Sequence, residues 1–192
     1  YLYDSLINHP KLVGADPNNK RRNKSGNFKE PNLLLQNDIT REKYIAAFEG
    51  NLRGKPSANI LVDASTSYTK WPLRHITESD IKKISNNYLC IYLIRDPIDR
   101  FESHINFKYG LRKNMLKNDL NKICRSKGAF FALDIGNYAM QLFGYRDTFE
   151  KGKLLIIDFN DFINNPQKTL KVICDKIEIE FHDLPQDNSK EL

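Results

Sequence analysis

The feature that most constrains the fold is a continuous apolar run, Tyr88–Ile94, which ends at Arg95. Its mixture of aliphatic, aromatic and cysteine side chains is typical of a strand that is covered on both faces. Asp96 and Pro97 follow at once, and these residue types are favoured at a helix N-cap and at the first helical position. The run therefore predicts a central strand that leads directly into a helix, which we expect to continue to about Tyr109.

Further strands and helices are expected to alternate along the chain. The apolar segments Asn59–Ala64 and Lys153–Phe159 predict two more buried strands. Helices are expected at residues 1–9, 40–48 with Gly50 closing it, 77–84, 137–149 and from Asn165-Pro166 onward. Strands that alternate with helices indicate an α/β fold with a mainly parallel sheet. We expect one three-layer domain over residues 1–192, with helices on both faces of the sheet.

The composition fits a globular domain, and its positive charge favours an anionic partner but equally fits a soluble basic surface. The 192 residues are 40% hydrophobic and 28% charged, which is near the globular average, and the formal net charge is +6. This charge does not distinguish a nucleotide from nucleic acid, an acidic glycan or a membrane surface. No run approaches the roughly 20 apolar residues that span a bilayer. The three cysteines and four histidines lack metal-ligand spacing, so we expect no metal site.

Arg95 stands where a parallel sheet usually binds its ligand. Ligands gather at the carboxyl ends of the strands, where helix N-termini present free N–H groups to anions. A guanidinium at this point can donate two hydrogen bonds to one phosphate. Ser103 follows two helical turns later and reaches the same phosphate only if the helix folds back across the strand end. Without further sequence context, Arg95 could also be an arginine in a salt bridge, and Ser103 could also be a serine on a helix surface.

The segment Leu93–His104 reads Leu-Ile-Arg-Asp-Pro-Ile-Asp-Arg-Phe-Glu-Ser-His. It resembles the 3′-phosphate-binding segment of sulfotransferases, in which an apolar strand ends in Arg-x-Pro-x-x-Arg-x-x-Ser. The resemblance implies a P-loop-NTPase-like sulfotransferase fold. It implies 3′-phosphoadenosine 5′-phosphosulfate (PAPS) as the sulfuryl donor and adenosine 3′,5′-bisphosphate as the product. Arg95 and Ser103 would bind the 3′-phosphate, and Arg100 would support the same pocket or form a structural ion pair.

Weaker matches occur in the same order along the chain. Lys29–Leu34 resembles the Lys-Glu-Pro-His-Phe-Phe segment of glycan-type and bacterial sulfotransferases, and Val62–Tyr68 resembles their Gly-Glu-x-Ser-Pro-x-Tyr turn. Gly136–Tyr138 looks like their later Gly-x-Tyr helix, and Leu154–Phe162 looks like their Tyr-Glu-Asp-Leu strand end. Tyr1–Pro10 looks like the helix that follows their 5′-phosphosulfate loop. The resemblance therefore covers nearly the whole chain, most strongly at the strand-end arginine.

The resemblance also implies roles for residues on the acceptor side. Glu30 would be the general base that takes the acceptor's proton, although a surface glutamate before a proline turn has the same sequence. Lys29 would neutralise the sulfonate or pair with Glu30. Tyr68 and Trp71 would line the acceptor cleft, with core packing as the other reading of either ring. The acceptor would be a hydroxyl or an amine of a glycan or a small molecule.

The sequence departs from the family pattern in ways that leave the acceptor open. Asn32, Leu33 and Leu34 replace His-Phe-Phe, and Thr66 replaces the turn proline. The Gly- and Lys-containing phosphosulfate loop would lie before Tyr1, and a loop that covers the cofactor would lie beyond Leu192. We therefore expect a fragment, truncated at the N-terminus and also at the C-terminus, that is inactive alone.

Two other functions remain open at this point. One is an inactive nucleotide-binding remnant or interaction module without turnover. The other is a nucleic-acid-binding domain that uses the basic residues at 20–24, which only the charge supports because a recognition element is missing. We expect neither a nucleic-acid partner nor a membrane span in this segment. A bacterial member would be cytoplasmic, and a eukaryotic glycan-modifying member would lie in the Golgi lumen.

Overall fold

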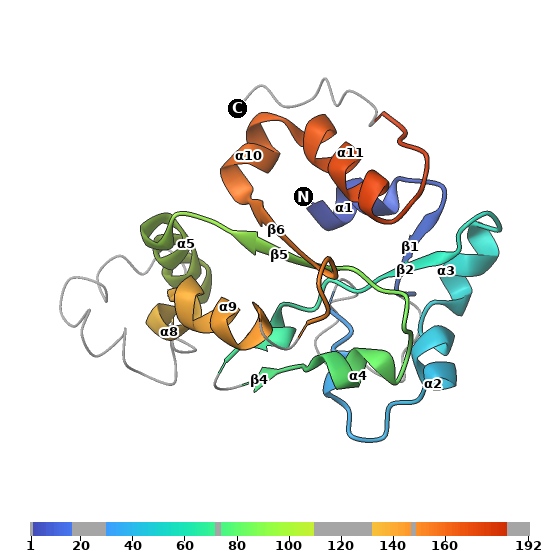
Figure 1. Cartoon of the computed structure of the whole chain (residues 1–192), viewed down its shortest axis with the longest axis horizontal. Coiled ribbons are helices and arrows are strands. Elements are labelled where there is room, and N and C mark those ends of the chain that lie inside the picture. Colours follow the sequence, from blue (N-terminus) through green and yellow to red (C-terminus); the bar gives the residue numbers. More distant parts are fainter. Residues whose placement is uncertain (1, 17–29, 72–73, 110–131, 147–148, 184–192) are drawn as a thin grey trace.

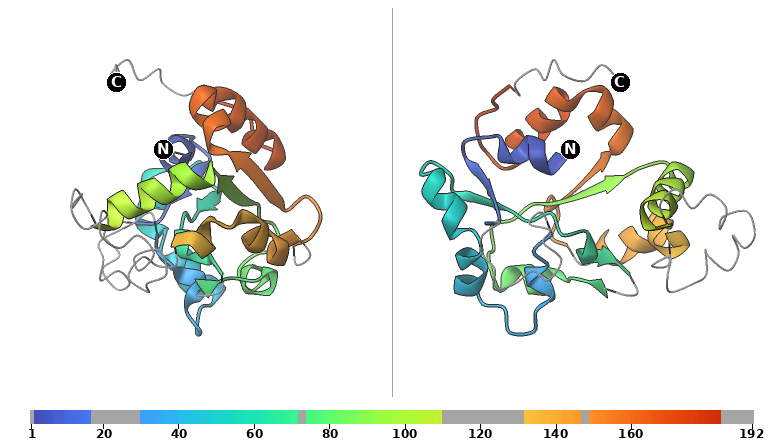
Figure 2. Two further views of the ribbon diagram at one scale, coloured as in Figure 1. Left: turned by 90° about the vertical axis from the view of Figure 1, so that its left-hand side faces the viewer. Right: turned by 180° about the vertical axis from the view of Figure 1, so that it is seen from behind.

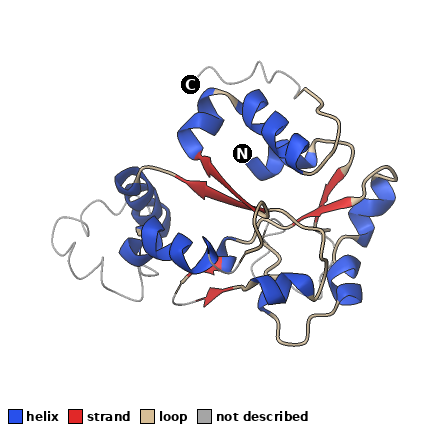
Figure 3. Ribbon diagram, viewed as in Figure 1, coloured by secondary structure: helices blue, strands red, loops and turns tan. Residues whose placement is uncertain are grey.

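The structure is a computed structural model that describes residues 2–16, 30–71, 74–109, 132–146 and 149–183 (Figure 1). The helices are α1 Leu2–Ile7, α2 Arg41–Ala46, α3 Glu49–Gly54, α4 Glu78–Lys82, α5 Pro97–Tyr109, α8 Ala132–Gly136, α9 Tyr138–Arg146, α10 Phe159–Asn164 and α11 Pro166–Lys176. The strands are β1 Leu12–Gly14, β2 Ile60–Val62, β3 Thr69–Lys70, β4 Arg74–His75, β5 Cys90–Ile94 and β6 Leu154–Asp158, and the 3₁₀ turns are η1 Leu33–Leu35 and η2 Thr66–Tyr68. Strands and helices alternate, which confirms the expected α/β class (Figure 3).

The strands pair in parallel, as expected, but not as one continuous sheet. Strand β1 pairs with β2, and β5 pairs with β6 from Cys90 opposite Leu154 to Ile94 opposite Asp158. Among the described residues these are two separate two-stranded ladders, beside a short antiparallel β3–β4 hairpin. Tyr88–Ile94 was expected to be a central strand: its residues Cys90–Ile94 do form the parallel strand β5, but among the described residues β5 has a backbone partner on one side only, β6. An apolar run reveals burial but not its pairing partners.

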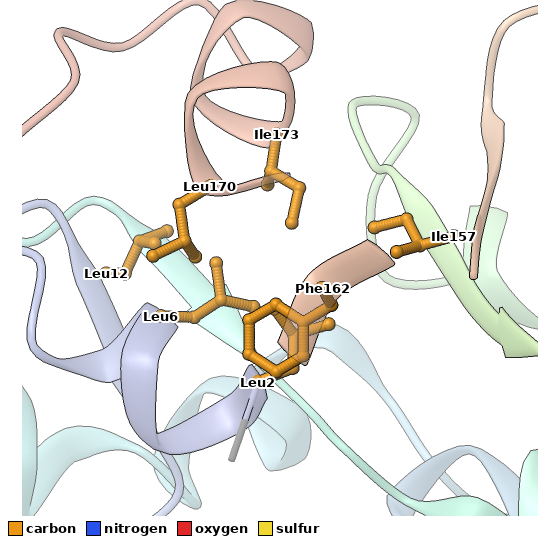
Figure 4. Packing of buried hydrophobic residues seen from close by; sticks show 7 residues of the cluster. All are labelled: Leu2, Leu6, Leu12, Ile157, Phe162, Leu170 and Ile173. Carbon is orange, nitrogen blue, oxygen red and sulfur yellow. The ribbon is translucent and has the colours of Figure 1, made fainter. Parts of the chain in front are cut away.

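Both ladders nevertheless contribute to one core. Its buried members come from α1, β1, β6, α10 and α11 and are Leu2, Leu6, Leu12, Ile157, Phe162, Leu170 and Ile173 (Figure 4). Ile60 of β2 and Ile91 of β5 pack against this cluster from the two ladders. The next residue, Tyr92, faces the other way and contacts the rings of Tyr138 and Tyr145 in α9. This alternation along β5 places strands between two helical layers, α1, α10 and α11 on one side and α9 on the other (Figures 1 and 2).

The local start signals of the helices are confirmed. The Thr40 side chain accepts a hydrogen bond from the Lys43 N–H at 3.3 Å at the start of α2. Thr77 and Asp80 form a capping box at α4. Asn165 accepts from the Lys168 N–H at 3.1 Å in front of Pro166 at α11. Side-chain oxygens at these positions satisfy N–H groups that the first turn of a helix leaves free.

Several expected boundaries shift. Helix α1 ends at Ile7, and the short strand β1 follows, which its three residues were too few to predict. Gly50 lies inside α3 and does not end α2. The helix expected over residues 137–149 is α9, which ends at Arg146, and the Asn160–Phe162 segment belongs to helix α10.

Gly14 leaves room for Tyr3 where α1 packs on β1, because a Cβ at Gly14 would overlap the Tyr3 hydroxyl and displace that side chain. Within the described ranges, none of the helices has the length and apolar character needed to cross a membrane.

Candidate active site

The turn between β5 and α5 is fixed from two sides. Asp96 Oδ1 accepts from the N–H groups of Ile98 at 2.9 Å and Asp99 at 3.0 Å, so Asp96 caps α5 as the sequence predicts. From the neighbouring layer, the Tyr138 hydroxyl accepts from the Arg95 N–H at 3.2 Å. The backbone that carries Arg95 is thus held at the carboxyl end of β5.

The guanidinium of Arg95 has contacts but keeps an unused donor. Its Nη2 lies 3.6 Å from Asp99 Oδ2, and its Cζ lies 5.3 Å from the centroid of the Phe159 ring. Nε is buried and has no hydrogen-bond partner among the described residues. A buried donor without a partner costs about 1–3 kcal/mol, so an anion that accepts from it would be stabilised. The side chain is 34% exposed, which leaves it accessible to a ligand.

Arg100 connects α5 to α8. Its Nη1 donates to the Ala132 carbonyl at 2.6 Å, and its Nη2 lies 3.2 Å from His104 Nδ1. Burial lowers the pKa of the Arg100 guanidinium. A Cβ at Gly136 would lie 3.3 Å from Nη1, so this glycine leaves room for the arginine. Arg100 therefore supports the turn through a carbonyl and an imidazole, and the salt bridges among the described residues do not include it.

Ser103, the third residue expected at the 3′-phosphate, is exposed on α5. It lies on the same helix as Arg100 and eight residues after Arg95. Its contact with a phosphate stays a prediction.

A second cluster is built around the carboxylate of Asp63, which directly follows β2. Oδ1 accepts from the Ser65 N–H at 3.1 Å and from the Ser65 hydroxyl at 2.5 Å. Oδ2 accepts from the hydroxyls of Tyr68 at 2.5 Å and Tyr44 at 3.5 Å. Burial raises the pKa of Asp63, although these donors act in the opposite direction. Burial, followed by the charge of Asp63, also raises the pKa of Tyr68.

Glu30 lies at the edge of this cluster. Its Oε2 accepts from the Thr66 hydroxyl at 2.9 Å, and Lys70 Nζ lies 3.3 Å from the same hydroxyl oxygen. The Glu30 carbonyl accepts from the side-chain amide of Asn32 at 2.8 Å. Glu30 is half-buried, which places it where it can meet both a ligand and the η2 turn. Lys29, its expected partner, lies outside the described residues.

The two aromatic residues expected at the acceptor differ in accessibility. Tyr68 is only 8% exposed, and its hydroxyl is occupied by Asp63 and by the Leu34 N–H at 3.1 Å. Trp71 is 44% exposed. Its ring packs edge-on against the His75 ring, with 4.6 Å between the two ring centroids. The buried Gln141 side chain bonds both backbone groups of Trp71, accepting from N–H at 3.0 Å and donating to the carbonyl at 2.7 Å. Contact of either ring with an acceptor stays a prediction.

Helix α9 contacts both the β5–α5 turn and the cluster around Asp63, which the sequence analysis did not predict. Tyr138 bonds the Arg95 N–H, Gln141 bonds Trp71, and the Tyr145 hydroxyl donates to the Tyr68 carbonyl at 2.6 Å. Residues at these spacings share one helix face. The sequence signal was the helical spacing of apolar and aromatic residues at 138–149, which indicates a buried face but not what it contacts.

The fold and this geometry define an α/β domain with an arginine that keeps an unpartnered buried donor at a strand end, and with the carboxylate of Asp63 in a hydrogen-bonded turn after another strand. The sulfotransferase domain family matches residues 69–191, which is more than half of the chain. The chain therefore belongs to the sulfotransferase family and is an enzyme of that class.

Solved structures show the same fold. A sulfotransferase from Alicyclobacillus acidocaldarius matches with a TM-score of 0.62 and 18% identity, over 100% of this chain and 80% of that one. The sulfotransferase domain from the curacin biosynthetic pathway matches with a TM-score of 0.56 and 19% identity, over 94% of this chain and 70% of that one. A search of curated protein sequences gave no significant match.

Proposed function

We propose that this sulfotransferase domain transfers a sulfuryl group from PAPS to an acceptor hydroxyl or amine, with adenosine 3′,5′-bisphosphate as the second product. The observation that carries the proposal is Arg95, whose buried Nε lacks a partner among the described residues at the carboxyl end of a parallel strand. A phosphate there would accept from this donor and benefit from the guanidinium charge. Ser103 on α5 is the proposed second donor to the 3′-phosphate.

On the acceptor side, the proposed base is Glu30. PAPS supplies the activated sulfuryl group when it is bound. An acceptor hydroxyl would lose its proton to the Glu30 carboxylate while its oxygen forms the new bond to sulfur, and the bond from sulfur to the phosphate oxygen breaks. Thr66 orients Glu30 Oε2 in this arrangement, and Lys29 is the proposed cation beside it. The chain's contribution is mainly positioning and charge stabilisation, as in phosphoryl transfer.

The acceptor proposed for the site is a glycan or a small molecule with an accessible ring face. Trp71 supports this choice because its ring is partly exposed while its backbone is fixed by Gln141. A rigid aromatic surface binds ring-shaped ligands with little loss of side-chain entropy.

The test compares two nucleotides that differ only in the 3′-phosphate. Calorimetric titration should show tighter binding of adenosine 3′,5′-bisphosphate than of adenosine 5′-monophosphate. Transfer by the full-length protein is then followed from ³⁵S-labelled PAPS to 4-nitrophenol and N-acetylglucosamine as acceptor probes. Equal affinity for both nucleotides contradicts the proposed 3′-phosphate site. Selective binding without any transfer to either probe favours a nucleotide-binding module without turnover.

A further inference from the structure

The hydrogen bonds around Asp63 have a defined direction. The Asn32 N–H donates to Ser65 Oγ at 2.8 Å, and the Leu34 N–H donates to the Tyr68 hydroxyl at 3.1 Å. A backbone N–H can only donate, so each hydroxyl uses a lone pair for the amide and its own proton for the carboxylate. Two hydrogen-bonded arms therefore run from the segment after Glu30 to Asp63, one through Ser65 and one through Tyr68.

These arms bond to a backbone segment with an uncommon conformation. Asn32 has φ 52° and ψ 34°, the left-handed conformation, which asparagine adopts more readily than most residues with a Cβ. Such a conformation persists where the surroundings over-determine it. Here the Asn32 N–H is bonded to Ser65, and its side-chain amide returns to the Glu30 carbonyl. The direction in which the chain leaves Glu30 thus depends on the arms.

We propose that Asp63 is a positioning residue for the candidate base Glu30, acting through the hydroxyls of Ser65 and Tyr68. The inference rests on the proposed function. The η2 turn that the carboxylate anchors also carries Thr66, whose hydroxyl binds Glu30 Oε2. Asp63 therefore fixes the backbone after Glu30 and, through the same turn, the hydroxyl that orients the Glu30 side chain.

The two arms and the Asp63 carboxylate, together called the clamp, have hydrogen-bonding roles that predict how each substitution acts. Asp63→Asn keeps the shape but replaces one accepting oxygen with an NH₂ donor, which faces a hydroxyl that needs an acceptor. Ser65→Ala cuts only the arm to Asn32, and Tyr68→Phe cuts only the arm to Leu34. Tyr44→Phe is the matched control, because Tyr44 donates to the same Asp63 oxygen without bonding to the segment after Glu30.

Amide hydrogen exchange measured by NMR reports on the hydrogen bonds of the clamp, and the measurement does not need an active enzyme. Ser65→Ala should speed exchange of the Asn32 amide and leave the Leu34 amide unchanged, and Tyr68→Phe should do the reverse. Each change should be about 2- to 12-fold, the range of one ordinary hydrogen bond. Asp63→Asn should speed at least one of the two amides by about 10- to 100-fold, because a charged acceptor is lost. Amides of β6 should keep their rates in every variant.

The same variants test the link to catalysis. Asp63→Asn should lower kcat for transfer from PAPS to 4-nitrophenol or N-acetylglucosamine, with affinity for adenosine 3′,5′-bisphosphate unchanged, and Tyr44→Phe should leave kcat near that of the parent. Unchanged Asn32 and Leu34 exchange in Asp63→Asn would overturn the clamp. Altered exchange with a parental kcat would overturn the positioning role. A full-length parent protein that transfers no sulfuryl group at all contradicts the proposed function instead, and the exchange rates still test the proposed hydrogen-bonded arms.

Discussion

Arg95→Ala tests the proposed nucleotide side of the site, because the contacts that Arg95 makes within the protein are weak enough to be separated from its proposed role in binding. Its ion pair with Asp99 spans 3.6 Å between side chains that are 34% and 52% exposed, and such pairs contribute about 0–1 kcal/mol. Its contact with the Phe159 ring, 5.3 Å from the centroid, adds about 0.5–1 kcal/mol. The substitution should therefore cost at most about 2 kcal/mol of folding stability.

The loss in binding should be larger. Truncating one partner of a buried, hydrogen-bonded charge pair costs about 2–5 kcal/mol. This corresponds to a roughly 30- to several-thousand-fold weaker affinity for adenosine 3′,5′-bisphosphate, at about 1.4 kcal/mol for each factor of ten. Adenosine 5′-monophosphate lacks the 3′-phosphate and should bind the variant as it binds the parent.

Calorimetric titration with both nucleotides, beside thermal melting, measures the two effects separately. Asp99→Asn is the matched control, since it breaks the same ion pair but keeps Arg95, and it should preserve the selectivity for the 3′-phosphate. Ser103→Ala should show a smaller selective loss, near the 0.5–1.5 kcal/mol of an ordinary hydrogen bond. Equal weakening of both nucleotides by Arg95→Ala would refute the reasoning and make Arg95 a structural residue.

Four further outcomes are expected. Glu30→Gln should lower kcat by about 10²- to 10⁴-fold with adenosine 3′,5′-bisphosphate affinity unchanged, measured by labelled transfer and calorimetry; equal losses in both would exclude the role of base. Arg100→Met should lower the free energy of unfolding by about 1–3 kcal/mol in urea titrations, because it removes the hydrogen bond from the half-buried guanidinium to the Ala132 carbonyl. Gln141→Leu should increase acrylamide quenching of Trp71, the only tryptophan, and a parental quenching constant would show that Gln141 does not fix it. The raised pKa of Asp63 means that the folded state binds its proton more tightly than the unfolded state does. The free energy of unfolding, relative to that of Asp63→Asn, should therefore rise as the pH falls from the folded pKa toward the unfolded pKa. A constant difference between the melting curves of the two proteins from about pH 7 to about pH 4 would contradict this.

The sequence predicted the strand, turn and helix cap around Arg95 because their signals are local. The apolar strand, Arg95, the capping Asp96 and Pro97 lie within a few residues, and each acts on its immediate neighbours. The capping residues Thr40 and Thr77 were found for the same reason.

Strand pairing and the Asp63 arms were not predicted, because both join segments that are far apart in the chain. The arm from Asn32 to Ser65 spans 33 residues, and the arm from Leu34 to Tyr68 spans 34. The sequence does contain Asp63, Ser65 and Tyr68 at the spacing of the family's turn, but this spacing does not reveal which other segment the turn contacts. Only the packed structure brings two N–H groups of another segment onto their hydroxyls.

Helix α9 connects the two halves of the proposed site. The proposed nucleotide side lies at the β5–α5 turn, and the proposed acceptor side lies at the turn after β2, which belongs to the other parallel ladder. Among the described residues these ladders share no backbone pairing, and side chains of α9 connect the two turns. Tyr138 bonds the backbone of Arg95, while Tyr145 bonds the backbone of Tyr68. Because one rigid helix carries both hydroxyls, a shift of either turn relative to the other would break one of these bonds, and in-line transfer needs that spacing to be constant.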